Sequence, residues 1–191
     1  MQFVQEHFTS TLEVKQSKFI AHLIPYALYD TVLEDLKHEH PKARHFVTAF
    51  RYLNEFEQIV EHSGDDGEPK GTSGKPSLIV LQGQDLINTA VIIVRYFGGT
   101  KLGTGGLVRA YSDAVNLVVE ESKLIEYKKE IYKKIILEYT DVRFIEYECE
   151  HFGIRIKDKL FSSDVVYEIV SDEVGMKSFL EKVSRVIKKI I

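Results

Sequence analysis

Residues 88–97, Asn-Thr-Ala-Val-Ile-Ile-Val-Arg-Tyr-Phe, constrain the fold most, because they form an almost continuous apolar run. A strand with one face in water alternates apolar and polar residues, whereas a strand covered on both faces stays apolar throughout. Two glycine-rich stretches, 63–76 and 98–106, lie before and after this run in the chain. We therefore predict that residues 88–97 form a central, doubly covered strand.

The periodicity of apolar residues predicts the neighbouring elements. Leu28, Val32 and Leu36 recur at helical spacing, and Pro41 closes that helix. Runs rich in β-branched and aromatic residues indicate strands, and Pro76 suits the first turn of a further helix. The expected strands are 12–23, as one strand or a bent pair, and 46–53; the expected helices are 28–38, 77–82 and 107 to about 122–124.

A charged connector at 123–130 separates this part from a second one with a different order of elements. Composition shifts of this kind mark domain boundaries, so we expect domains at 1–126 and 127–191. The second part reads βαββα with a possible final edge strand, which is the split-βαβ, ferredoxin-like arrangement. The expected strands are 131–139, 154–160, 164–170 and 186–191; the expected helices are 141–152 and one that carries Met176, Phe179, Leu180 and Val183.

The composition indicates the cellular compartment of the protein and argues against some classes of binding partner. The formal net charge is −4, so attraction to nucleic acid or to an anionic membrane would need a local basic patch. No apolar run approaches the roughly 18–20 residues of a membrane span, and the N-terminus has no export signal. The single cysteine, Cys149, cannot form an internal disulfide. We expect a cytoplasmic protein with no membrane partner.

The stretch 98–106 has the geometry of an anion site. It leads into a helix, so free N–H groups and the positive end of the helix dipole meet there, with Lys101 and Arg109 nearby. Phosphate is the expected anion, and a tight turn between strand and helix is the alternative. Neither a Walker A loop nor a dinucleotide fingerprint is present, because Gly103 is followed by Thr104 and Gly105.

Three carboxylates, Asp65, Asp66 and Glu68, lie within four residues of one another. Their spacing is not that of a calcium loop, so no metal is predicted. They could cap the 63–76 loop through side-chain hydrogen bonds. We favour instead a pairing of Asp65 and Asp66 with Arg95 or Arg109, because an arginine that interrupts an apolar strand must be paired or reach the strand end.

No catalytic constellation stands out. The sequence has neither a Gly-x-Ser-x-Gly elbow nor a histidine spacing typical of a metal site. Cys149 lies on the apolar side of its predicted helix, which indicates core packing. We predict no catalytic residue and no cofactor, and the sequence favours a binding role over an enzymatic one.

Several motifs follow one another in a fixed order along the chain. The main segments are Ser-Gly-Asp-Asp-Gly-Glu-Pro at 63–69, Gly-Thr-Ser-Gly-Lys-Pro at 71–76, Val-Arg-Tyr-Phe-Gly-Gly at 94–99 and Leu-Gly-Thr-Gly-Gly-Leu-Val-Arg-Ala-Tyr at 102–111. Together they resemble the signature of the YigZ/IMPACT family. Shorter matches, Lys-Phe-Ile-Ala at 18–21 and Pro-Lys-Ala-Arg-His at 41–45, keep the same type and order. The resemblance covers residues 10–125 through its motifs and the remainder through its domain pattern.

The resemblance implies an α+β fold: an α/β sandwich similar to the second domain of ribosomal protein S5, then a ferredoxin-like βαββαβ domain similar to the last domain of elongation factor G. Both parallels are to components of translation. Eukaryotic relatives regulate translation by competing for the activator of the amino-acid-starvation kinase, with the help of an additional N-terminal domain. This chain starts at the shared domain and resembles the bacterial branch, so we do not carry kinase regulation over.

Two functional hypotheses follow. The first is a non-enzymatic regulatory protein that binds RNA, the ribosome or translation factors through a basic strip of Lys70, Lys75, Arg95, Lys101 and Arg109. The second is an enzyme or sensor that binds a small phosphorylated or anionic ligand between the two glycine-rich stretches. The candidate ligand-binding or structural cluster consists of Asp65, Asp66, Glu68, Lys75, Arg95, Gly98, Gly99, Lys101, Gly103, Thr104, Gly105, Gly106 and Arg109.

Overall fold

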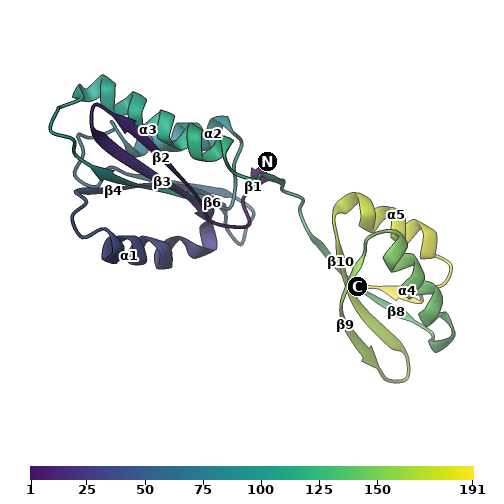
Figure 1. The fold of residues 1–191 in the computed structure, drawn as a ribbon. Helices are drawn as coiled ribbons and strands as arrows, with labels where there is room; N and C mark the ends of the chain where they lie inside the picture. The colour runs from purple at the N-terminus through teal and green to yellow at the C-terminus, as the bar shows by residue number, and fades with distance from the viewer. The chain divides into compact units, whose positions relative to one another are not determined.

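The computed structural model describes all 191 residues (Figure 1). The chain divides into two compact units, Met1–Tyr127 and Lys128–Ile191. The division falls within the charged connector at 123–130. Each unit has its own buried apolar cluster and is described by itself.

Unit 1 is built on a five-stranded antiparallel sheet with the strand order β2-β3-β6-β4-β5. Helices α2 and α3 cover one face of the sheet, and α1 covers the other (Figure 1). A short pair, β1 (Gln2–Phe3) and β7 (Ile125–Glu126), joins the two ends of the unit. The main elements are β2 (Phe8–Val14), β3 (Ser17–Pro25), α1 (Tyr29–Glu39), β4 (His45–Leu53), β5 (Ile59–Gly64), α2 (Gly74–Gly83), β6 (Thr89–Tyr96) and α3 (Gly103–Glu120).

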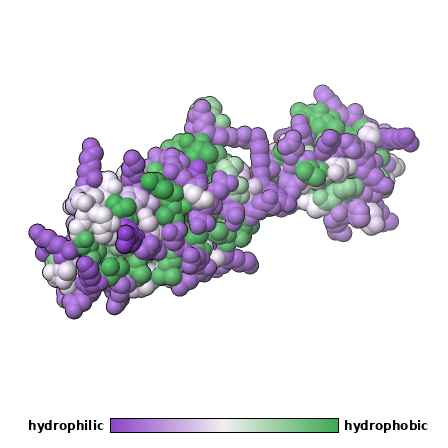
Figure 2. Space-filling model, turned by 90° about the horizontal axis from the view of Figure 1, so that it is seen from above, coloured by the Kyte–Doolittle hydropathy of each residue, from purple (hydrophilic) through white to green (hydrophobic).

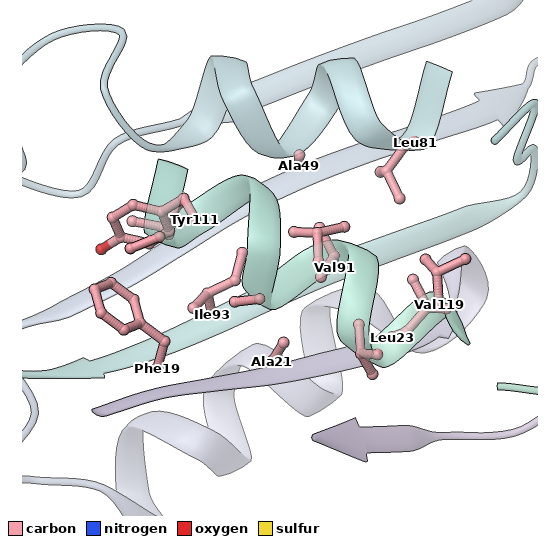
Figure 3. Close-up of a cluster of buried hydrophobic side chains, with 14 of the residues drawn as sticks. Phe19, Ala21, Leu23, Ala49, Leu81, Val91, Ile93, Tyr111 and Val119 are labelled. Atoms are coloured by element: carbon pink, nitrogen blue, oxygen red, sulfur yellow. The ribbon is translucent and has the colours of Figure 1, made fainter. Parts of the chain in front are cut away.

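Strand β6 is the predicted central strand. All its residues from 89 to 95 are buried, because helices cover both of its faces. Val91 and Ile93 belong to the cluster under α2 and α3, whereas Ile92 and Val94 belong to the cluster under α1. Figure 3 shows Val91 and Ile93 beneath α3, with Tyr111 of that helix above Phe19 of β3; these two rings meet edge to face, 5.1 Å apart. Continuous apolarity here reflects cover on both sides.

The structure decides one open alternative and adds one strand that was not expected. The segment 12–23 is a hairpin, which confirms the bent pair over the single strand, and its turn places Lys15 and Gln16 at φ of 46° and 65°. Strand β5 was not predicted from the sequence. Most of its residues are exposed at the edge of the sheet, so its sequence, Ile-Val-Glu-His-Ser-Gly, carries almost no apolar alternation.

Unit 2 has a four-stranded antiparallel sheet with the order β11-β8-β10-β9 and two helices. In chain order this is 4-1-3-2, the ferredoxin-like topology, so the predicted α+β class is confirmed. Cys149 lies in the core with 2% exposure, and burial raises the pKa of its thiol to about 12. The elements are β8 (Ile131–Leu137), α4 (Val142–His151), β9 (Arg155–Phe161), β10 (Val165–Ser171), α5 (Glu173–Val183) and β11 (Lys189–Ile190).

None of the helices in either unit combines the length and the apolar character that a membrane crossing requires.

Candidate functional site: the glycine-rich end of unit 1

Both glycine-rich stretches lie at one end of the five-stranded sheet. Strands β3 and β4 begin there and β5 and β6 end there, as the pairing of Lys18 with Tyr96 and of His45 with Arg95 shows. The first stretch connects β5 to α2, and the second connects β6 to α3. The sheet therefore brings together two loops that lie about 30 residues apart in the sequence.

Asp65 organises the first loop from within. Its carboxylate accepts hydrogen bonds from the N–H groups of Gly71, Ser73 and Gly74 at 2.7, 3.2 and 2.9 Å, and from the Ser73 hydroxyl at 2.6 Å. Burial alone would raise the pKa of Asp65, but these hydrogen bonds outweigh it and lower the pKa. The start of α2 is therefore already occupied by a carboxylate of the chain and does not offer its free N–H groups to an external anion.

Asp66 ties the same loop to β4. Its Oδ2 accepts from the N–H of Phe46 at 2.6 Å, and its carbonyl lies 2.7 Å from Nδ1 of His45, which donates to it. Asp66 adopts a positive φ of 43°, and Gly67 follows with a φ of 83°, so the chain turns sharply here. Short polar residues tolerate such a conformation, which explains the Asp-Gly pair in the motif.

Glu68 and Arg95 form a buried ion pair behind the loop, with 8% and 5% exposure. Oε1 of Glu68 accepts from Nη1 of Arg95 and, at 2.8 Å, from the hydroxyl of Tyr111. Nε2 of His45 lies 3.9 Å from the same oxygen. The Arg95 guanidinium also lies 5.3 Å from the centre of the Phe19 ring. Burial, followed by the nearby Glu68, raises the pKa of Tyr111 far above its ordinary value, so the hydroxyl keeps its proton.

The predicted pairing of Asp65 or Asp66 with Arg95 or Arg109 is therefore wrong. Arg95 is paired, which was one of the two outcomes expected for an arginine in an apolar strand, but its partner is Glu68. Asp65 and Asp66 accept from backbone N–H groups and cap the loop, which was the other interpretation. The free backbone donors of the turn lie closer to these two carboxylates than any guanidinium does, and spacing alone does not reveal this.

The second glycine-rich stretch starts with a close approach of two backbones. A Cβ on Gly98 would lie 2.0 Å from the carbonyl carbon of Gln16, and the N–H of Gly98 donates to Oγ of Ser17 at 3.1 Å. Gly99 and Gly103 follow with φ of 91° and 74°. Both conformations favour glycine, so this part of the motif meets demands of the backbone.

The last four residues of this stretch belong to α3. Gly103, Thr104, Gly105 and Gly106 form the first turn of α3, and no side chain caps that turn. A Cβ on Gly105 would meet nothing within 4 Å, so the surface there is open. The start of α3, unlike that of α2, thus leaves its N–H groups to solvent or to a ligand.

Unpaired cations surround these loops. Eight of the twelve Lys and Arg residues before residue 126 lie at this end of unit 1; all eight are exposed and none forms an ion pair. Figure 2, a view of the α2 and α3 side, shows hydrophilic side chains in purple at this end, at left. Arg95 does not belong to the basic surface, because it is buried and paired. We call this set the basic end: Lys15, Lys18, Lys42, Arg44, Lys70, Lys75, Lys101 and Arg109.

Sequence reasoning missed half of the basic end and two groups behind it. Lys15, Lys18, Lys42 and Arg44 lie 50 or more residues before the second glycine-rich stretch, and only the pairing of β3 and β4 with β6 brings them to it. His45 of β4 and Tyr111 of α3 contact Glu68 only because the fold brings these two elements to the first glycine-rich loop. The only signal available was that five of these six positions, all except Lys15, fall inside the motif segments given above.

Three histidines gather on the α1 side of the sheet. Nε2 of His7 lies 2.9 Å from Nδ1 of His22, and the rings of His22 and His40 are 6.5 Å apart. Burial, and then the neighbouring His7 and His40, lowers the pKa of His22 to about 4, so this imidazole is neutral at pH 7. The sequence did not reveal this cluster, because β2–β3 pairing creates it. No group of side chains suited to a metal ion is found in the chain.

The role of Asp65 predicts an acid-sensitive loop. Because its folded pKa lies below the unfolded value, its contribution to stability is complete above about pH 4 and is lost as pH falls through the lower folded pKa. Asp65→Asn should cost about 1–2 kcal/mol of unfolding free energy at pH 7 and less at pH 3. Urea unfolding at both pH values measures this. Asp113→Asn, an exposed carboxylate without a hydrogen-bond partner, is the control. An equal loss at both pH values would contradict the assignment.

Comparisons with known proteins agree with this architecture. The family model of the Impact N-terminal domain matches residues 15–119. An IMPACT family member of Haemophilus influenzae is 36% identical over 163 residues, which are 80% of this chain and 76% of the relative. The IMPACT family member YvyE of Bacillus subtilis is 32% identical over 181 residues, 93% of this chain and 82% of the relative.

The crystal structure of a hypothetical protein is similar to the whole fold. It is 28% identical, the similarity covers 96% of this chain and 90% of that one, and the TM-score is 0.67. The matched range 15–119 contains the Asp65 loop, the Glu68–Arg95 pair and the start of α3. These residues therefore lie within the part that defines the family, and the chain belongs to the IMPACT family.

Proposed function

We propose that this chain is a non-enzymatic binding protein that acts in the control of translation by contacting RNA, either free or in the ribosome, through the basic end. The observation that carries the proposal is the set of eight exposed Lys and Arg side chains without ion-pair partners at one end of unit 1. Lys and Arg that neutralise backbone phosphates supply most of non-specific nucleic-acid affinity. Because the net charge of the chain is −4, attraction to nucleic acid requires a local basic surface, and the basic end is such a surface.

Charge is segregated along unit 1. Acidic side chains lie at the opposite end of the sheet, where Glu55 and Glu57 occupy the β4–β5 turn and Glu120 and Glu121 end α3. Three carboxylates of the first glycine-rich loop, Asp65, Asp66 and Glu68, accept hydrogen bonds from the chain itself. An RNA strand would therefore be attracted to one end and repelled from the other.

The start of α3 supports a phosphate contact at the same place. Its first N–H groups have no side-chain cap, and Lys101 and Arg109 lie just before and within the first two turns. Helix N-termini bind phosphate through N–H groups and the helix dipole, without reading a base. The resemblance of the first domain to a ribosomal protein domain indicates translation as the process in which such binding would act.

Reversing two charges tests this proposal. Lys101→Glu/Arg109→Glu should weaken binding to a short single-stranded RNA and to ribosomes by roughly tenfold or more at low salt. The slope of log affinity against log salt should fall in magnitude by about 2, one for each lost phosphate contact. Fluorescence anisotropy at 50 and 200 mM salt, and ribosome co-sedimentation, provide the measurements.

The matched control is Lys123→Glu/Lys182→Glu. These two lysines are also exposed and without ion-pair partners, and the change in net charge is identical. Lys123 follows the end of α3, away from the basic end, and Lys182 lies in α5 of unit 2. Affinity should remain within about twofold of the unmodified chain, since screening limits charge effects beyond about 10 Å at 0.1 M salt. No binding by the unmodified chain at low salt, or equal losses in both double variants, would rule the proposal out.

A further inference from the structure

Phe97 is an exposed aromatic side chain among the cations of the basic end. Among the phenylalanine and tyrosine side chains of unit 1, two are exposed: Phe97, at 43%, and Phe56, at 73%. Phe56 lies in the β4–β5 turn at the opposite, acidic end, whereas Phe97 directly follows β6 and begins the connection to α3. An exposed apolar side chain is not unusual by itself. This one, however, lies where the unpaired cations gather.

Three cations of the basic end lie on segments next to Phe97. Lys18 of β3 pairs with the residue immediately before Phe97. Arg44 precedes β4, and its N–H donates to the carbonyl of Arg95 at 3.3 Å. Lys101 follows Phe97 four residues later in the chain. A nucleic-acid strand whose phosphates contact these cations would therefore pass within reach of the Phe97 ring.

The fold fixes the position of Phe97 before any ligand binds. The backbone of the next residue, Gly98, packs so closely on Gln16 that a Cβ would lie 2.0 Å from the Gln16 carbonyl carbon. The Arg95 guanidinium lies over the Phe97 ring, 5.9 Å from its centre, and the ion pair with Glu68 holds this guanidinium in turn. A side chain that is already ordered loses little conformational entropy when a ligand covers it.

An exposed ring surrounded by unpaired cations limits the class of ligand. Every nucleobase has a flat π-face that stacks on an aromatic side chain. A base offers this face only where it is unpaired and splayed out of a helix. An apolar protein surface would cover Phe97 but leave the eight cations of the basic end without the negative charge that phosphates supply. The surface therefore fits a single-stranded nucleic acid better than a duplex or an apolar protein partner.

We propose that Phe97 is a stacking platform that makes the basic end selective for unpaired RNA. The cations bind the phosphates, and one unpaired base stacks on the exposed part of the Phe97 ring. This inference rests on the function proposed above and names the class of RNA that the same site takes. Because all four bases stack, the site has little preference for sequence.

Abasic RNA separates stacking from charge. A ribose-phosphate chain without bases carries the same phosphates as an RNA of equal length, but it has nothing to stack on Phe97. At low salt the unmodified protein should bind a short single-stranded RNA roughly tenfold more tightly than the abasic chain, which is the order of affinity that one stacked base contributes. Fluorescence anisotropy with labelled ligands measures both affinities.

Phe97→Ala should weaken binding to the single-stranded RNA roughly tenfold, down to the affinity of the abasic chain. It should leave binding to the abasic chain and to an RNA duplex within about twofold, and the salt dependence unchanged, because no phosphate contact is lost. The matched control is Phe56→Ala, which removes the other exposed phenylalanine of unit 1. This control should bind all three ligands as the unmodified protein does.

Two further variants separate stacking from a general effect on folding. Phe97→Trp keeps an aromatic ring and should retain the affinity for single-stranded RNA. The natural chain contains no tryptophan, so the fluorescence of this variant reports on position 97 alone. RNA should quench this fluorescence, and the abasic chain should not. Phe97→Leu keeps an apolar side chain without a ring and should bind as weakly as Phe97→Ala.

Two results would overturn the inference and leave the charge-based function in place. One is equal affinity of the unmodified protein for single-stranded RNA and for the abasic chain. The other is an equal loss for all three ligands in Phe97→Ala, since the substitution would then act on the fold rather than on a stacked base. If the unmodified protein bound no RNA at low salt, both the inference and the proposed function would fail.

Discussion

Glu68→Ala is expected to lower the free energy of unfolding by about 3–5 kcal/mol, because it leaves a buried guanidinium without a counter-charge. Arg95 is 5% exposed and its Nε already has no hydrogen-bond partner, so the protein cannot easily hydrate it. The Tyr111 hydroxyl would lose its acceptor as well. Since a domain is stabilised by about 5–15 kcal/mol in total, the loss is a large fraction. Urea unfolding at pH 7 measures it.

A double variant separates the lost ion pair from the lost packing. Glu68→Leu/Arg95→Met replaces the pair with apolar side chains of similar volume, and such replacements of buried pairs are often neutral or stabilising. We expect the double variant to be more stable than Glu68→Ala, although each position is changed. A loss below about 1 kcal/mol for Glu68→Ala would mean that solvent reaches Arg95 after all.

Gly98→Ala is expected to destabilise unit 1 by about 3 kcal/mol or more, the upper end of what overpacking costs. The added Cβ would lie 2.0 and 2.2 Å from the carbonyl carbon and oxygen of Gln16 and 2.2 Å from the N–H nitrogen of Ser17. All three are backbone atoms, so no side chain can rotate away. The hairpin turn between β2 and β3 or the end of β6 must move instead. Thermal unfolding followed by circular dichroism provides the measurement.

Gly105→Ala is the matched control for this prediction. It lies in the same motif, but it is helical and a Cβ there would meet nothing within 4 Å. Alanine is a better helix former than glycine, so this variant should be as stable as the unmodified chain or more stable by about 0.5 kcal/mol. If both variants unfolded at the same temperature, the close approach at Gly98 would not explain why glycine occupies that position.

The glycines of the second glycine-rich stretch are therefore present for two different physical reasons. Gly98, Gly99 and Gly103 answer steric and dihedral demands of the backbone. Gly105 answers no such demand, and it keeps the surface at the start of α3 open. This distinction indicates that substitutions at Gly105 would report on binding, whereas substitutions at Gly98 would report on folding.

Much of the fold could be predicted from the sequence because the signals are local. The unbroken apolar run at 88–97 indicated a doubly covered strand, and β6 is one. The helical spacing of apolar residues located α1. The succession of strand and helix patterns after residue 130 indicated the ferredoxin-like order of unit 2. The edge strand β5 escaped prediction because its exposure on the sheet edge leaves it no apolar pattern. A strand that buries little leaves little trace in its sequence.

The sequence by itself determined that Arg95 must be paired or reach the strand end, and that both glycine-rich stretches depart from ordinary packing. Only the tertiary structure decided that the partner is Glu68, that Asp65 and Asp66 cap their own loop, and that the basic end includes cations from before β4. The reason is that charge and burial requirements belong to single residues and can be read from residue type. The choice among several carboxylates depends on distances of a few ångströms, which strand register and loop closure set across the whole of unit 1.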